Sequence, residues 1–237
     1  MTEQEKMCSR QVGGARNGYQ AALLARGGAV GTPNAFDGSA GLLAAMGGKT
    51  DPAVMEAALF GRFRFMEIES KPIDGCLMIQ TPAQLMECIS RDYDVGIDDI
   101  ERIVVTVSRQ ALNQAGCDSF SVENSVQAKM NIRYAVASVI CNHGISGIRW
   151  KRPFDEQVTG LMRRIELVEE PAYTNRFPGK VSAGIYILLK DGRSIQHEQE
   201  DFQSLPVEQV KERFLRLTDL MDLKDTAKQI LRELKME

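Results

Sequence analysis

The stretch Lys180-Val-Ser-Ala-Gly-Ile-Tyr-Ile-Leu-Leu-Lys190 is followed by Asp191-Gly192-Arg193 and then by Ser194-Ile-Gln-His-Glu198. Every second residue from Val181 to Leu189 is apolar, which is the period of a strand with one buried face. An Asp-Gly pair between two such runs is typical of a tight two-residue turn. The sequence therefore predicts an antiparallel β-hairpin at this point of the chain.

Two further strands are predicted upstream of the hairpin. Residues 103–107 read Ile-Val-Val-Thr-Val, a β-branched run that favours a strand, and residues 165–168 read Ile-Glu-Leu-Val. We expect the 103–107 strand and the hairpin to share one sheet. A single long helix is predicted over residues 124–142, with an apolar face that packs on this sheet.

Helices are predicted toward both ends of the chain. Near the N-terminus they cover residues 15–25, which Gly27-Gly28 stops, 37–46, and 52 to about 59. Thr81-Pro82-Ala83-Gln84 resembles a capping box that opens a helix to about Arg91. Amphipathic helices are predicted from Pro206 and after a capping Asp222. The fold class is α+β: a helical part of residues 1–70 and 203–237, and an α+β domain of residues 71–202.

Charge and composition exclude several classes of protein. The chain has 237 residues, with 29 Lys and Arg against 32 Asp and Glu, and 6% aromatic residues. A nucleic-acid partner is not expected without a basic excess, and no apolar run is long enough for a membrane partner. The five cysteines are odd in number and form no CxxC pair, which favours a reducing, cytoplasmic location. Cys141-Asn142-His143 is two ligands short of a zinc site, so no metal site is predicted.

Four segments in order resemble the MmgE/PrpD family, which includes 2-methylcitrate dehydratase, cis-aconitate decarboxylase and iminodisuccinate epimerase. The segments are Gly14-Ala-Arg-Asn-Gly18 with the helix after it, Glu69-Ser-Lys-Pro72, Ala128-Lys-Met-Asn-Ile-Arg-Tyr-Ala-Val-Ala137, and residues 179–193 with 207–215. The resemblance implies a helical domain built from both chain ends and an α+β lid domain. It extends only to the C-terminal half of the longer family members.

The resemblance also implies a type of chemistry and a set of site residues. Family reactions need no cofactor and act beside the carboxylates of small acids, so a site needs cations and a proton donor or acceptor. Lys71 stands at the family's lid lysine and Tyr134 at a family tyrosine, and both are predicted as catalytic. Arg16 and Lys129 are predicted to bind the substrate. Arg16 is suited to holding a carboxylate through two hydrogen bonds, and not to acting as a base.

Several readings of the function stay open because the chain departs from the family pattern. The family's lid histidine falls near Cys76 or Gln80, and its arginine falls at Leu77. The chain is predicted to be a lyase or isomerase, completed either by a partner chain that resembles the family's N-terminal half or by a second copy as a homodimer. The alternative is a scaffold or stabilising subunit that has lost the chemistry.

Overall fold

The computed structural model describes residues 3–39, 41–45, 68–93, 95–116, 120–152 and 154–234. Their contacts divide the chain into two compact units, Met1–Ile68 and Glu69–Glu237. In the first unit, helix α1 spans Glu3–Arg26 and the short α2 spans Leu42–Ala45. Helix α1 ends before Gly27-Gly28 as predicted, and Gly28 has a φ of 92°, which a glycine adopts without penalty. The helix predicted from residue 52 to about 59 lies outside the described residues.

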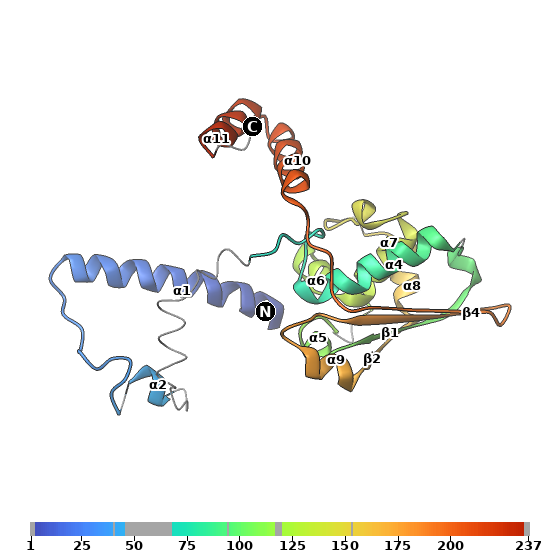
Figure 1. The fold of residues 1–237 in the computed structure, drawn as a ribbon, viewed down its shortest axis with the longest axis horizontal. Coiled ribbons are helices and arrows are strands. Elements are labelled where there is room, and N and C mark those ends of the chain that lie inside the picture. Colours follow the sequence, from blue (N-terminus) through green and yellow to red (C-terminus); the bar gives the residue numbers. More distant parts are fainter. Residues whose placement is uncertain are drawn as a thin grey trace. The chain divides into compact units, whose positions relative to one another are not determined.

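The second unit is built on a four-stranded mixed sheet in the order β2-β1-β3-β4 (Figure 1). The strands are β1, Ile100–Val107; β2, Ile165–Glu169; β3, Ala183–Leu189; and β4, Ser194–Gln199. Strand β1 pairs in parallel with β2 and antiparallel with β3, and β3 and β4 form a hairpin. The predicted hairpin and its shared sheet with residues 103–107 are therefore confirmed.

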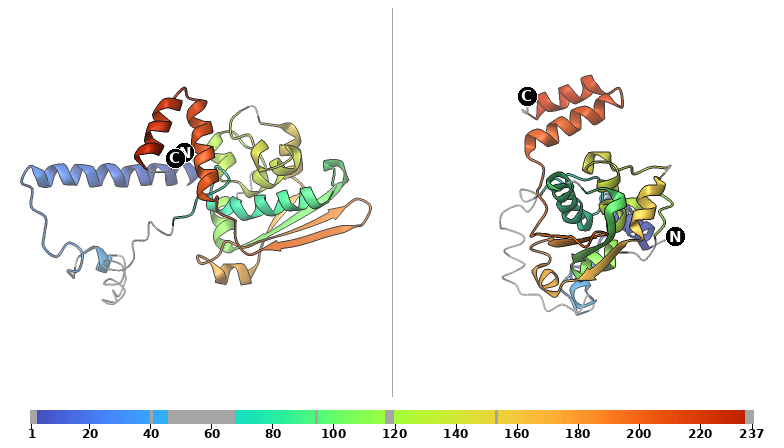
Figure 2. Two further views of the ribbon diagram at one scale, coloured as in Figure 1. Left: turned by 45° about the horizontal axis from the view of Figure 1, so that its top comes forward. Right: turned by 90° about the vertical axis from the view of Figure 1, so that its right-hand side faces the viewer.

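Helices and strands of the second unit enclose one apolar core. Helix α4 (Gln80–Asp92) packs against β3 and β4, and α7 (Ile132–Cys141) packs against α4 and α8 (Glu156–Met162) (Figures 1 and 2). Alternate residues of β1 and β3, among them Val105 and Ile187, are buried in this core. The short helices α5 (Arg109–Ala115) and α9 (Pro171–Arg176) contact each other, and α5 also contacts β2. The fold is mixed α+β, as predicted.

The long helix predicted over residues 124–142 is in fact two helices. Helix α6 spans Ser125–Lys129, and α7 begins at Ile132. The side chain of Asn131 accepts a hydrogen bond from the backbone N–H of Tyr134 at 3.0 Å and so caps α7. Because a capping residue adopts extended backbone angles, Asn131 interrupts the helix that its apolar periodicity suggested.

The start of α4 also differs from the prediction. The helix begins at Gln80 after the 3₁₀ turn η2 (Leu77–Ile79), and no side chain caps it. The hydroxyl of Thr81 donates instead to the carbonyl oxygen of Val181. The predicted capping box is therefore wrong, because a contact with a segment 100 residues away uses the hydroxyl.

Two amphipathic helices follow the sheet, α10 (Val207–Asp219) and α11 (Lys224–Glu233). Both were predicted, but Leu223 precedes α11 as its first flanking residue and no side chain caps it, so Asp222 is not the cap. By contacts these helices belong to the second unit. That residues 203–237 form one helical part with residues 1–70 stays a prediction.

Candidate functional site

The segment from Lys71 to Cys76 is held in place by one buried side chain, Gln80. The amide oxygen of Gln80 accepts the backbone N–H of Ile73 at 3.0 Å. Its amide nitrogen donates to the carbonyl oxygens of Ile73 at 2.9 Å and Cys76 at 3.0 Å. Because the Gln80 side chain is fully buried, these bonds do not compete with water. The loop is thereby fixed relative to the start of α4.

Two of the predicted site residues reach this loop with their ammonium groups. Lys71 Nζ donates to the carbonyl oxygen of Gly75 at 2.7 Å. Lys129 Nζ pairs with Asp74 Oδ2 at 2.7 Å, and the Lys129 carbonyl accepts the backbone N–H of Cys76 at 2.8 Å. A Cβ atom on Gly75 would lie 3.0 Å from that carbonyl oxygen and 2.4 Å from the terminal side-chain carbon of Ile79, so this close approach favours glycine.

A groove of about 360 Å³ lies between this loop and α10, and we call it the Lys71 groove. It is lined by Ser70, Lys71, Ile73, Asp74, Gly75, Leu205, Val210, Arg213, Phe214 and Leu217. Arg213 donates to the carbonyl oxygens of Lys71 at 3.0 Å and Pro72 at 3.4 Å. Two cationic side chains, one carboxylate and an apolar wall thus share the groove, an arrangement suited to binding an organic anion.

Arg213 was not found from the sequence. The helical period after Pro206 predicts an amphipathic helix, whose apolar face includes Phe214 and Leu217. Nothing local shows that the arginine beside them contacts a loop 142 residues earlier.

Tyr134 lies in the core of the second unit, on α7. Its side chain is 1% exposed, and its ring lies 5.7 Å from the ring of Phe154 and 6.2 Å from that of Trp150, between centroids. The hydroxyl donates to the carbonyl oxygen of Arg149. Burial raises the pKa of Tyr134 above its ordinary value. Tyr134 does not line the Lys71 groove, and its catalytic role stays a prediction.

Arg16 lies on α1 in the first unit, where it is exposed. Its part in binding a substrate together with Lys71 therefore also stays a prediction.

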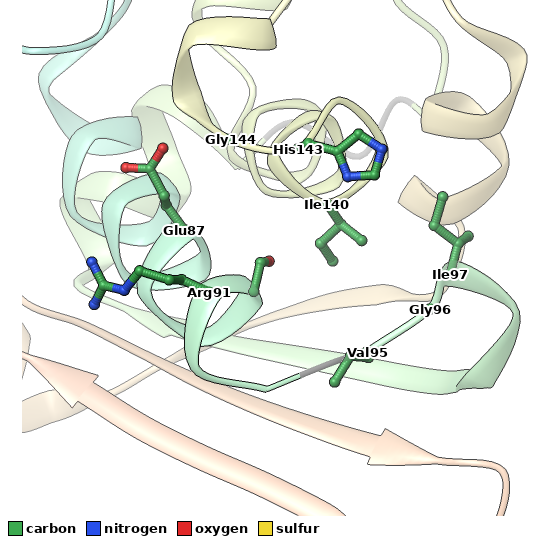
Figure 3. Close-up of a pocket in the computed structure, with 9 residues that line it drawn as sticks. Glu87, Arg91, Val95, Gly96, Ile97, Ile140, His143 and Gly144 are labelled. Atoms are coloured by element: carbon green, nitrogen blue, oxygen red, sulfur yellow. The ribbon is translucent and has the colours of Figure 1, made fainter.

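A second hollow, of about 550 Å³, lies between the ends of α4 and α7 and contains His143 (Figure 3). Glu87 Oε1 accepts the backbone N–H of Ile145 at 2.9 Å, so this carboxylate holds the turn that ends α7. Figure 3 shows the guanidinium of Arg91 directed away from the His143 ring. The other histidine, His197, hydrogen-bonds the hydroxyl of Tyr93 at 2.9 Å. Neither imidazole lines the Lys71 groove.

Among the residues that the structure describes, no group of three or more His, Cys, Asp or Glu side chains is arranged to hold a metal ion. No helix within those described residues combines the length and apolar character needed to cross a bilayer.

Comparison with known proteins places the chain in a family. A family model described as the MmgE/PrpD C-terminal domain matches residues 75–232. The chain belongs to the MmgE/PrpD family. Comparison with curated proteins found no match. The MmgE/PrpD match includes all four strands, Gln80, Lys129, Tyr134 and Arg213, whereas Lys71 precedes it. Membership is compatible with a lyase or dehydratase activity.

Proposed function

We propose that the chain binds a small di- or tricarboxylate in the Lys71 groove and contributes this site to a lyase or isomerase. The observation that supports the proposal is the convergence of two lysines on one loop, with Lys71 Nζ on the Gly75 carbonyl and Lys129 Nζ on the Asp74 carboxylate, each at 2.7 Å. The reaction would be a dehydration, decarboxylation or isomerisation, in line with the family.

The Lys71 groove combines positive charge with an apolar wall, and a carboxylate that leaves water needs such a charge nearby. Lys71 and Arg213 supply positive charge, and the side chains of Phe214 and Leu217 form an apolar wall on one side. A fixed cation offsets part of the cost of removing a carboxylate from water. Asp74 already pairs with Lys129, so a substrate carboxylate would compete with Asp74 for that lysine.

Lys71 and Asp74 line the groove and carry titratable groups, but neither imidazole nor the Tyr134 hydroxyl lines it, so further acid or base groups would come from elsewhere. We expect them from a partner chain that resembles the family's N-terminal half, or from a second copy. Exposed apolar residues on α10, α11 and their connection support such a partner, since patches of this kind mark interfaces. They include Leu217, Leu220, Met221, Leu223 and Ile230. Light scattering should detect a dimer or a complex, and a monomer without affinity for any partner would contradict this expectation.

A scaffold or stabilising subunit is the second candidate function. It is favoured by Gln80, which stands near the position of the family's lid histidine. All the polar atoms of this glutamine side chain are engaged with the 73–76 loop, so Gln80 supports structure and offers no acid or base.

The binding part of the proposal is tested with Lys71→Ala. The matched control is Lys190→Ala, a lysine that is also exposed and lies at the β3–β4 turn of the same unit. Calorimetric titration with cis-aconitate and 2-methylcitrate should give a dissociation constant roughly ten- to a hundredfold higher for Lys71→Ala, since a charge-assisted contact contributes about 1.5–3 kcal/mol. Equal affinities of both variants and the unaltered protein would refute the Lys71 groove as the binding site.

A measurement of turnover distinguishes the proposed enzyme function from the scaffold function. The chain should convert one of these acids when mixed with its partner or assembled as a homodimer, and Lys71→Ala should slow that conversion by a similar factor. Carboxylate binding without conversion in either assembly would favour the scaffold.

A further inference from the structure

A third pocket lies on the second unit, away from the Lys71 groove. It has a volume of about 600 Å³ and is lined by Phe120, Ser121, Val122, Arg152, Phe154, Thr159 and Arg163. It shares no lining residue with the Lys71 groove or with the His143 hollow. We call it the Arg152/Arg163 pocket.

The described residues of its wall carry a positive charge. Two arginines line it, and among those described residues there is no aspartate or glutamate. The side chain of Arg163 forms no hydrogen bond or ion pair to the residues that the structure describes. Arg152 uses only its Nε, which donates to the Glu123 carbonyl at 2.5 Å, so its terminal nitrogens stay available. The chain as a whole carries a formal charge of -3, and this pocket is therefore a local exception.

The rest of the wall combines two aromatic rings and Val122 with the hydroxyl-bearing Ser121 and Thr159. Phe154 is partly buried and lies edge-on to Tyr134, at 5.7 Å between ring centroids. Phe120 has its ring beneath the guanidinium carbon of Arg133, 5.2 Å from the centroid. Flat ligands stack on such rings.

We propose that the Arg152/Arg163 pocket binds a small organic acid that joins an anionic group to a flat apolar part. The anionic group lies against the two guanidinium groups, and the flat part lies against Phe120 and Phe154. Arginine fits carboxylate and phosphate equally well through paired hydrogen bonds, so the class is defined by an oxyanion next to an unsaturated or aromatic body. The proposal does not depend on the reaction suggested for the Lys71 groove.

The chain carries its own reporter for this site. Trp150 is the single tryptophan, stands two residues before Arg152 and packs against Tyr134. Its fluorescence can be followed while benzoate, phenyl phosphate, inorganic phosphate or the neutral benzamide is added to the full chain. Benzoate or phenyl phosphate should change the emission in a saturable way, and the tighter of the two assigns carboxylate or phosphate as the preferred anion. Benzamide and inorganic phosphate should each bind at least about tenfold more weakly, because each lacks one half of the ligand.

Two charge-removing variants test the assignment. Arg163→Gln should raise the dissociation constant about tenfold, and because Arg163 has no bond to break, the fold should be kept. Arg152→Gln should do the same, with its melting temperature measured to detect any effect of losing the bond to Glu123. The matched control is Arg193→Gln, an exposed arginine at the β3–β4 turn. Lys71→Ala should leave benzoate binding unchanged, which separates this pocket from the Lys71 groove.

Three results of these titrations would overturn the proposal. The proposal is overturned if Arg163→Gln binds benzoate and phenyl phosphate as tightly as the unaltered protein while remaining folded. It is also overturned if benzamide binds as tightly as benzoate, or if inorganic phosphate binds as tightly as phenyl phosphate.

Discussion

Replacing Gln80 with leucine tests whether one side chain holds the loop that carries Lys71. Leucine fills nearly the same volume, so the variant removes hydrogen bonds and leaves little cavity. Four hydrogen bonds are lost, the weakest of them to the Gly75 carbonyl at 3.4 Å, and the Gln80 side chain has no exposed surface.

The expected loss of unfolding free energy follows from the hydrogen bonds that each loop atom keeps in the Gln80→Leu variant. The Ile73 carbonyl still accepts the Gly75 N–H at 2.9 Å, and the Cys76 carbonyl still accepts the Ile79 N–H at 3.3 Å. The Ile73 N–H, in contrast, loses the partner that Gln80 provides. An orphaned buried donor costs about 1–3 kcal/mol and each lost bond to a shared carbonyl about 0.5 kcal/mol or more. The free energy of unfolding should therefore fall by about 2–4 kcal/mol.

Urea unfolding of the Gln80→Leu protein, followed by circular dichroism, measures this change. Gln157→Leu, a substitution of an exposed glutamine on α8, is the control and should change the free energy by less than about 0.5 kcal/mol. Carboxylate affinity should fall as well, because Lys71 would lose its fixed position. If Gln80→Leu unfolds at the same urea concentration as the control and with the same slope, the loop is held by something other than Gln80.

Three further predictions concern single groups. Thr81→Val should lower the free energy of unfolding by about 1–2 kcal/mol, because the buried Val181 carbonyl loses its donor, whereas Thr81→Ser should restore most of it in the same urea titration. Asp74→Asn should change stability by less than about 1 kcal/mol, since its pair with Lys129 is partly exposed, but should tighten cis-aconitate binding measured by calorimetry; unchanged or weaker binding would contradict this. Burial raises the pKa of the Cys141 thiol from 9.0 to about 11, so its contribution to stability is fully present below pH 9 and is lost as the pH rises to about 11. Mass spectrometry of iodoacetamide labelling at Cys141 should accordingly show a rate that keeps rising to about pH 11 in the folded protein and levels off near pH 9 in urea; matching profiles would disprove it.

Local sequence patterns predicted the hairpin and the β1 strand because both depend on residues that are close together in the chain. Alternation of apolar residues fixes which face of β3 is buried, and Asp191-Gly192 fixes the turn. The interruption at Asn131 was missed for a different reason. Apolar residues continue at helical spacing across it, and only the capping bond to the Tyr134 N–H shows that two helices meet there.

The same difference between local sequence patterns and long-range contacts applies to the residues of the candidate site. Lys71 and Lys129 were identified from short motifs, and both reach the 73–76 loop. Arg213 comes from a helix far along the chain, and the Arg152/Arg163 pocket joins segments that no motif connects. Side chains that meet through tertiary packing leave no periodic signal, which is why the sequence predicted the loop cations and not their distant neighbour.

The position of β1 in the middle of the sheet has a consequence for synthesis on the ribosome. Ile103 pairs with Ile165, 62 residues later, and Val105 with Ile185, 80 residues later. At about 5–20 residues per second, the central strand waits roughly 4–16 s before both of its edges are covered. During that time the backbone edges of an Ile-Val-Val-Thr-Val segment stay open to other nascent chains. A slower elongation rate lengthens this interval, and with it the time in which β1 can pair with a strand of another chain.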